Sequence, residues 1–325
     1  MNAIAILTNQ QQDRESLGRM RRSLAKRWDD ADGHVAIGYF WMNQYRKDLF
    51  RAGLKTQPWL EKKAIWVQSD IEHQLQILRN LDDVQSRKYQ AFARQNRALQ
   101  QANTHFQFAT HFCPWNSTTH LWLATSEFLM GEDQSGKRAK QATRFAGGKV
   151  DTWYRIGLFH AAADEKELAI SAWQKCLTYS RQYDQLITNW ARQLNIGDIE
   201  AILPKDPGVC YRFAMREQKS NDTEKAIQLA KLGIRHAHDN PKSVNNWQEH
   251  ATVAKLYSLL DNEKEYMRSW QESVNTGGEP ARISFANHLI SKRKFKEARK
   301  QLGMCRSKDA TKVLLRLNEL QSAVQ

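Results

Sequence analysis

The sequence predicts an all-α protein built as a stack of paired helices. Apolar residues recur at helical spacing through most of the 325 residues, and long alternating runs of β-branched residues are absent. Only six Pro and fifteen Gly interrupt this pattern. The clearest pair lies between Trp153 and Leu177, where two short apolar stripes flank a turn. A chain of this length need not form two globular domains, because stacked pairs grow along one axis.

Small residues explain how the two helices of this pair approach each other. Gly157 and Ala169 bring the backbones close, and Trp153 and Trp173 fill the space around the contact. The stretch reads W-x2-I-G-x2-H and then A-x3-W, and it resembles the tetratricopeptide repeat (TPR), W-x2-L-G-x2-Y and then A-x3-F. His160 stands where that family has Tyr. The resemblance implies a right-handed superhelical α-solenoid of TPR-like helix-turn-helix repeats.

The same pattern recurs before and after this pair. The slot of Ala169 is taken elsewhere by Ala102, Ala139, Ala226, Tyr266 and Ala298. The step from Tyr266 to Ala298 is close to the family period of about 34 residues. The step from Ala169 to Ala226 is much longer, so we expect a helical insert there. Ile37-Gly38 repeats the Ile156-Gly157 pattern and predicts a degenerate repeat near the N-terminus.

This register divides the chain into four segments. We expect an N-terminal helical region at 1–83, TPR-like repeats at 84–177, a helical insert at 178–207, and further repeats with a C-terminal capping helix at 208–325. Within the first segment, apolar spacing predicts a helix over 60–81. The capping helix spans Ala310 to Leu320, which suits the open end of a stack.

Turn chemistry supports the register. Asp164 and Asn221 occupy the same slot, and each is followed three residues later by Glu, which predicts a capping box at the start of the second helix. Asp261 and Asn262 serve a similar turn. Arg293 takes this place in the last repeat and does not fit the pattern.

No motif for catalysis, cofactor binding or metal binding stands out. The four Cys are scattered without CxxC spacing, which argues against zinc and against a disulfide framework. Residues 131–137 fit G-x4-G-K, the start of a phosphate-binding loop, but Arg138 replaces the required Ser or Thr and a helix precedes the loop. No run reaches the length of a membrane span. We therefore expect a non-enzymatic, cytoplasmic protein without cofactor or metal.

The resemblance also implies where a partner binds. In TPR proteins the first helices of successive repeats line a concave groove that takes a peptide or helix. The register places nine residues there: Tyr154, Arg155, Leu158, Tyr211, Arg212, Met215, Lys255, Ile283 and Asn287. Tyr suits an interface because it offers large area and a polar tip, although packing between repeats explains the same residues. The Lys and Asn clamp that holds a terminal carboxylate in some family members is not reproduced, since Tyr154 and Leu158 stand in its place.

Charge offers a second function. The net charge is +14, and the sequence from Arg282 onward contains eleven basic residues and three acidic ones. A basic patch is expected across a turn at Lys292, Arg293, Lys294, Lys296, Arg299 and Lys300. Such a surface can contact nucleic acid, acidic lipid headgroups or an acidic protein, or it can be the solvated face of a basic protein. The Trp and Phe residues lie mostly at positions expected to pack between helices and are not interleaved with these cations, as a platform for stacking bases would require. A protein or peptide partner is therefore favoured over nucleic acid.

A weaker resemblance concerns the run from Trp173 to Ala214. It looks like the repeat regions attached to bacterial membrane polysaccharide ligases and polymerases of the O-antigen type. Those proteins carry membrane spans, and no run in this chain is long enough to be one. The resemblance implies an accessory role in cell-surface polysaccharide assembly.

Overall fold

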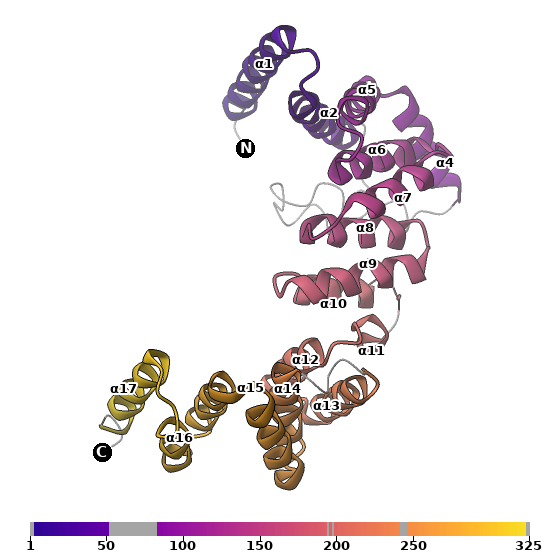
Figure 1. Ribbon diagram of the computed structural model, residues 1–325. Coiled ribbons are helices and arrows are strands. Elements are labelled where there is room, and N and C mark those ends of the chain that lie inside the picture. Colours follow the sequence, from indigo (N-terminus) through magenta and orange to yellow (C-terminus); the bar gives the residue numbers. More distant parts are fainter. Residues whose placement is uncertain (1–2, 52–82, 194, 197, 241–245, 323–325) are drawn as a thin grey trace. The chain divides into compact units, whose positions relative to one another are not determined.

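A computed structural model describes residues 3–51, 83–193, 195–196, 198–240 and 246–322. All regular structure in these ranges is helical, so the all-α prediction is confirmed (Figure 1). The chain divides into two compact units, Met1–Gly197 (unit 1) and Asp198–Gln325 (unit 2). The boundary falls inside the segment predicted as an insert. The helix predicted over 60–81 lies outside the described residues.

Unit 1 consists of helices that pack mainly against their neighbours in the chain. Its helices are α1 (Ala3–Lys26), α2 (Ala31–Arg51), α4 (Asp83–Gln95), α5 (Arg97–Phe112), α6 (Ser117–Met130), α7 (Ser135–Phe145), α8 (Val150–Ala162), α9 (Lys166–Tyr179) and α10 (Asp184–Gln193). Helices α6 and α7 form one antiparallel pair and α8 and α9 the next. Both match the predicted TPR-like repeats.

Unit 2 continues the same plan. Its helices are α11 (Ile199–Ile202), α12 (Pro207–Lys219), α13 (Thr223–His238), α14 (Trp247–Leu259), α15 (Glu263–Ser291), α16 (Phe295–Leu302) and α17 (Lys308–Ser322). The α15 helix is broken at Gly278, whose φ of 59° is left-handed, and Pro280 starts its second part. The first part of α15 pairs with α14, and the second part pairs with α16.

The glycine of the motif sets the distance between paired helices. Gly157 on α8 lies directly against the Trp173 indole of α9, so that a Cβ at this position would collide with the ring. Trp173 is fully buried, and its Nε1 donates to the Tyr154 carbonyl at 3.2 Å. The role predicted for Gly157 is confirmed.

The degenerate repeat near the N-terminus is split. Helix α2 packs most extensively against α5, which does not follow it directly in the chain, and less extensively against α1. Gly38 on α2 lies against the Phe106 ring of α5, which reproduces the contact between Gly157 and Trp173. Residues 52–96 therefore separate the first helix of this repeat from its second helix.

One backbone motif closes the turns within the pairs. Asp164, Asn221, Asp261 and Arg293 all have φ between 51° and 63°. The residue after each donates its N–H to the carbonyl five positions earlier, at 2.8 to 3.1 Å, a Schellman-type helix end. Arg293 thus takes the same conformation as the other three, although its side chain is not typical of it.

The predicted capping boxes are one residue too early. Asp164 and Asn221 precede the N-cap, and the caps themselves are Glu165 and Asp222. Only Asp222 caps through its side chain, accepting from the Lys225 N–H at 3.1 Å. The N-cap lies one residue later than predicted because of the backbone. The left-handed residue ends the first helix, so the second helix can begin only after it.

The segment predicted as an insert contains another first helix. After α10, Asn195 is left-handed with φ 47°, and Ile196 donates to the Ala191 carbonyl at 3.0 Å. The same turn comes after α8, α12 and α14. Helix α10 thus ends like the first helix of a repeat, and the next helix, α11, has only four residues.

The stretch that resembles a phosphate-binding loop is a turn between helices. Gly131 ends α6 in the left-handed conformation, with φ 70°. Gly136 already lies in α7. Since a helix and not a strand precedes the turn, its interpretation as a turn within a repeat is confirmed. Among the described helices none has the length and apolarity to cross a membrane.

Candidate functional site

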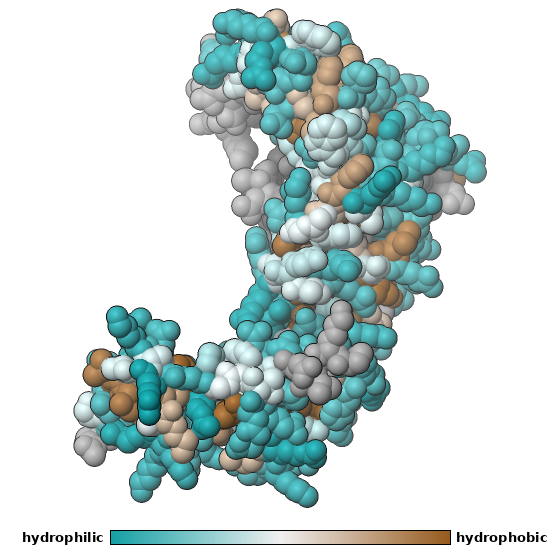
Figure 2. All heavy atoms as spheres, in the orientation of Figure 1, coloured by the Kyte–Doolittle hydropathy of each residue, from teal (hydrophilic) through white to brown (hydrophobic). Residues whose placement is uncertain are grey.

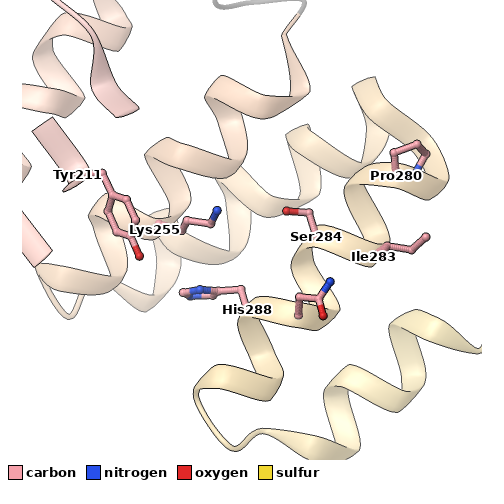
Figure 3. A pocket seen from close by; sticks show the side chains of 7 residues that line it. Tyr211, Lys255, Pro280, Ile283, Ser284 and His288 are labelled. Carbon is pink, nitrogen blue, oxygen red and sulfur yellow. The ribbon is translucent and has the colours of Figure 1, made fainter. Parts of the chain in front are cut away.

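A pocket of about 470 Å³ lies on the first helices of unit 2. Its lining comes from three successive first helices. Tyr211 lies on α12, Lys255 on α14, and the remaining lining residues on the second part of α15 are Pro280, Ile283, Ser284, Asn287 and His288. In Figure 3 the side chains of Lys255, Ser284 and His288 point toward a common space from two helices.

The break in α15 positions one wall of this pocket. Because the chain restarts its helix at Pro280, the residues at 280, 283, 284, 287 and 288 recur at helical spacing and share one face. Phe285 and Leu289 occupy the opposite side and are buried in the core cluster of unit 2, where Phe285 stacks on Trp270 with ring centroids 4.7 Å apart. The core contacts therefore hold this helix with its polar face turned to the pocket.

Lys255 is the central charge. Its Nζ lies 6.0 Å from the ring centroid of Tyr211 and 6.0 Å from that of Trp270, at the distance of a cation–π contact. Burial lowers the pKa of Lys255, and burial also raises the pKa of Tyr211. The ammonium is therefore partly removed from water and held by aromatic rings.

His288 lies against the same aromatic floor. Its ring centroid is 5.8 Å from that of Tyr266 and 5.7 Å from that of Trp270. Burial lowers the pKa of His288 to about 4, helped by the positive charges of Lys255 and of two further lysines in the α15–α16 turn. The imidazole is neutral at neutral pH, and its buried Nε2 has no hydrogen-bond partner among the described residues.

Only some of the nine residues predicted to line the groove lie at this pocket. Four of them line the pocket: Tyr211, Lys255, Ile283 and Asn287. Arg212 and Met215 lie on α12 but do not line it. Arg212 sits over the Phe213 ring at 5.9 Å.

The three predicted groove residues of unit 1 pack against other side chains of the chain. Tyr154 and Leu158 are only 2% and 3% exposed, so neither presents a contact surface to a partner. The Tyr154 ring stacks on Tyr183 with centroids 4.4 Å apart, and its hydroxyl accepts from Trp190 Nε1 at 2.9 Å. Arg155 lies over Trp122 at 5.7 Å. Packing between repeats, the alternative for these residues, explains their positions.

Sequence reasoning missed three lining residues, namely Pro280, Ser284 and His288. A signal for them was present. Ile283 and Asn287 were named from the register, and positions three and four residues apart share a helix face. Pro280 lies three residues before Ile283, Ser284 lies three before Asn287, and His288 lies four after Ser284, so the same helix face includes all three. What the register lacked was the start of the helix after Gly278.

The basic patch crosses the turn between α15 and α16, as expected. All six of its residues are exposed. Two of them contact their own chain: Lys294 pairs with Glu263 at 3.2 Å, and Arg299 donates to Asn318 and Gln321 at 2.7 and 2.6 Å. Figure 2 shows hydrophilic residues over most of the visible face, with hydrophobic residues in small groups.

Comparisons with known proteins return distant structural likenesses. No family model and no curated protein matches the chain. Similar solved structures include the TPR2AB domain of yeast Sti1 in complex with pHSP90 (17% identity; 75% of this chain and 100% of that chain covered; TM-score 0.26). A second is yeast Tom70 (14% identity; 99% of this chain and 75% of that chain covered; TM-score 0.29). A third is the APC/C hetero-tetramer Cut9–Hcn1 (11% identity; 96% of this chain and 74% of that chain covered; TM-score 0.31).

These are all TPR-repeat proteins. At such TM-scores, the description of the fold rests on the helix pairs and turns of this chain itself. The weaker resemblance to O-antigen ligases and polymerases has no counterpart among these three structures. The chain is accordingly described as an all-α protein of TPR-like helix-turn-helix repeats.

Proposed function

We propose that the chain is a non-catalytic interaction scaffold that binds a segment of a partner protein on the first helices of unit 2. The observation that carries this proposal is the pocket between α12, α14 and the second part of α15. It is lined by residues from three successive first helices, and the repeat register alone names four of these residues. Its mixture of apolar and polar side chains suits a peptide.

The groove in unit 1 is a poorer candidate. Tyr154 lies beneath Tyr183 and Trp190, so a partner would have to displace those aromatic rings. The basic patch supports the alternative of a surface for nucleic acid or anionic membrane. In that case binding would fall steeply with salt and would depend on exposed cations such as Lys296 and Lys300. A role in polysaccharide assembly rests on the sequence resemblance alone, and no residue of the pocket supports it.

Peptide selection tests the scaffold proposal. A displayed library of random peptides would be selected on the full chain and rescreened on Asn287→Trp, which fills the pocket mouth from an exposed position. Asn275→Trp, also exposed but on the first part of α15, is the matched control. We expect binders that are lost on Asn287→Trp and kept on Asn275→Trp. Binders that ignore both variants would contradict the proposal.

A further inference from the structure

Among the seven residues that line the pocket in unit 2, Lys255 is the one with a charge at neutral pH. None of its seven lining residues is acidic. The charges of Lys292 and Lys294, in the α15–α16 turn, also act on His288, and Lys294 is paired with Glu263 at 3.2 Å. A pocket with a lysine and no carboxylate among its lining residues is electrostatically complementary to an anion.

Lys255 is held where it can meet such an anion. Its ammonium lies 6.0 Å from the ring centroids of both Tyr211 and Trp270, and burial lowers its pKa. The rings offset only part of the lost hydration, because a cation–π contact is weaker than an ion pair with a hydrogen bond. A carboxylate entering the pocket would complete the solvation of this buried ammonium.

Neutral polar groups surround the ammonium. Ser284 and Asn287 on α15 supply a hydroxyl and an amide, and Tyr211 on α12 supplies a phenol. All three can donate hydrogen bonds to an oxygen anion. Pro280 and Ile283 add an apolar wall on which the methylenes of a ligand side chain can pack. The lining therefore fits a carboxylate on a short aliphatic stem.

Resting on the proposed function, the geometry points to a side-chain carboxylate of an acidic partner segment as the group that this pocket binds. A Glu or Asp side chain enters beside Lys255, and its neighbours in the segment face the α15–α16 turn. A run of acidic residues fits better than a single terminal carboxylate, because Lys292 and Arg293 are exposed on that turn and Lys296 is exposed at the start of α16. One terminal carboxylate would leave these cations unmatched.

Fluorescence anisotropy with defined probes tests this assignment on the full chain. The probes are a labelled oligoglutamate blocked at both ends, a matched oligoglutamine, and an oligoglutamine with a free C-terminus. The variants are Lys255→Met, which keeps the aliphatic stem between the rings, and Lys231→Met, which removes an exposed charge from α13. Lys255→Arg restores the charge.

We expect the blocked oligoglutamate to bind best. Lys255→Met should weaken its affinity at least about tenfold, as expected when a charged hydrogen-bond partner is lost. Lys231→Met should leave it nearly unchanged, and Lys255→Arg should retain most of it. Equal losses for Lys255→Met and Lys231→Met would overturn the assignment, since they would indicate general attraction to a basic protein. Preference for the free C-terminus would overturn the side-chain assignment.

Failure of this inference is distinguishable from failure of the scaffold proposal. If the selected peptides are lost on Asn287→Trp but are neutral and unaffected by Lys255→Met, the groove binds segments of another chemistry. If no selected peptide depends on Asn287, the scaffold proposal itself fails.

Discussion

At the scale of single residues, the glycine of the repeat motif determines whether two helices can pair. Gly157 has the Trp173 indole in the place where a Cβ would lie. Gly136, in α7, has no atom within 4 Å of such a Cβ. The same change therefore has opposite expected effects at these two positions.

We predict that Gly157→Ala lowers the free energy of unfolding by about 1–3 kcal/mol, the usual cost of overpacking. Gly136→Ala should raise it by up to about 1 kcal/mol, because Ala favours the helix. Thermal unfolding followed by circular dichroism measures both changes. A melting temperature for Gly157→Ala at or above that of the unaltered chain would mean that the contact with Trp173 is not tight.

Two histidines tie stability to pH. His105 and His288 both have pKa values lowered to about 4, mainly by burial. In an unfolded chain the pKa of His is about 6.5, so the unfolded state binds more protons between these two values. The free energy of unfolding should therefore fall as the pH drops from about 6.5 to about 4.

Urea unfolding at about pH 7 and about pH 5 checks this dependence. His288→Gln removes one of the two groups and should reduce the loss of stability between these pH values. The exposed His238→Gln is the control and should not change the loss. A loss for His288→Gln as large as that of the unaltered chain would contradict the prediction.

At the scale of elements, the split repeat shows where sequence reasoning stops. Ile37-Gly38 indicates a first helix, and Ala102-x3-Phe106 indicates a second helix. The sequence does not indicate that these two helices pair with each other, because a repeat motif relates helices that follow one another directly in the chain. Gly38 against Phe106 shows that α2 and α5 belong to one repeat, and the helix contacts agree.

We predict that Phe106→Leu loosens α2 and α5 together, because Phe106 is fully buried between them. Hydrogen exchange should become faster in both helices. The control is Phe145→Leu in α7, whose ring stacks on His120 of α6. It should affect α6 and α7 and leave α2 unchanged. Faster exchange in α5 without any change in α2 would contradict the pairing.

At the scale of the whole molecule, the sequence predicts the class of fold better than the place of the site. Helical spacing and the recurring small residues suffice for an all-α protein of TPR-like repeats. The groove residues come from one register for all repeats, yet Tyr154 is covered by Tyr183 and Trp190 and Tyr211 is not.

The difference between these two tyrosines depends on the neighbouring helix that packs over each of them. Helix α10 and the turn before it bring two aromatic side chains onto Tyr154. Helix α14 brings a lysine, Lys255, toward Tyr211. The break at Gly278 then adds a polar helix face opposite that lysine. Such long-range juxtaposition is set by the lengths of the repeats, which local motifs do not specify.

Hydrogen–deuterium exchange with and without a peptide selected on the full chain most directly tests whether unit 2 binds a partner through its first helices. We predict slower exchange in α12, in α14 and in α15 after Gly278, with the second helices α13 and α16 largely unchanged. Protection confined to the α15–α16 turn, or to α8 and α9 in unit 1, would contradict the assignment of this pocket as the binding site.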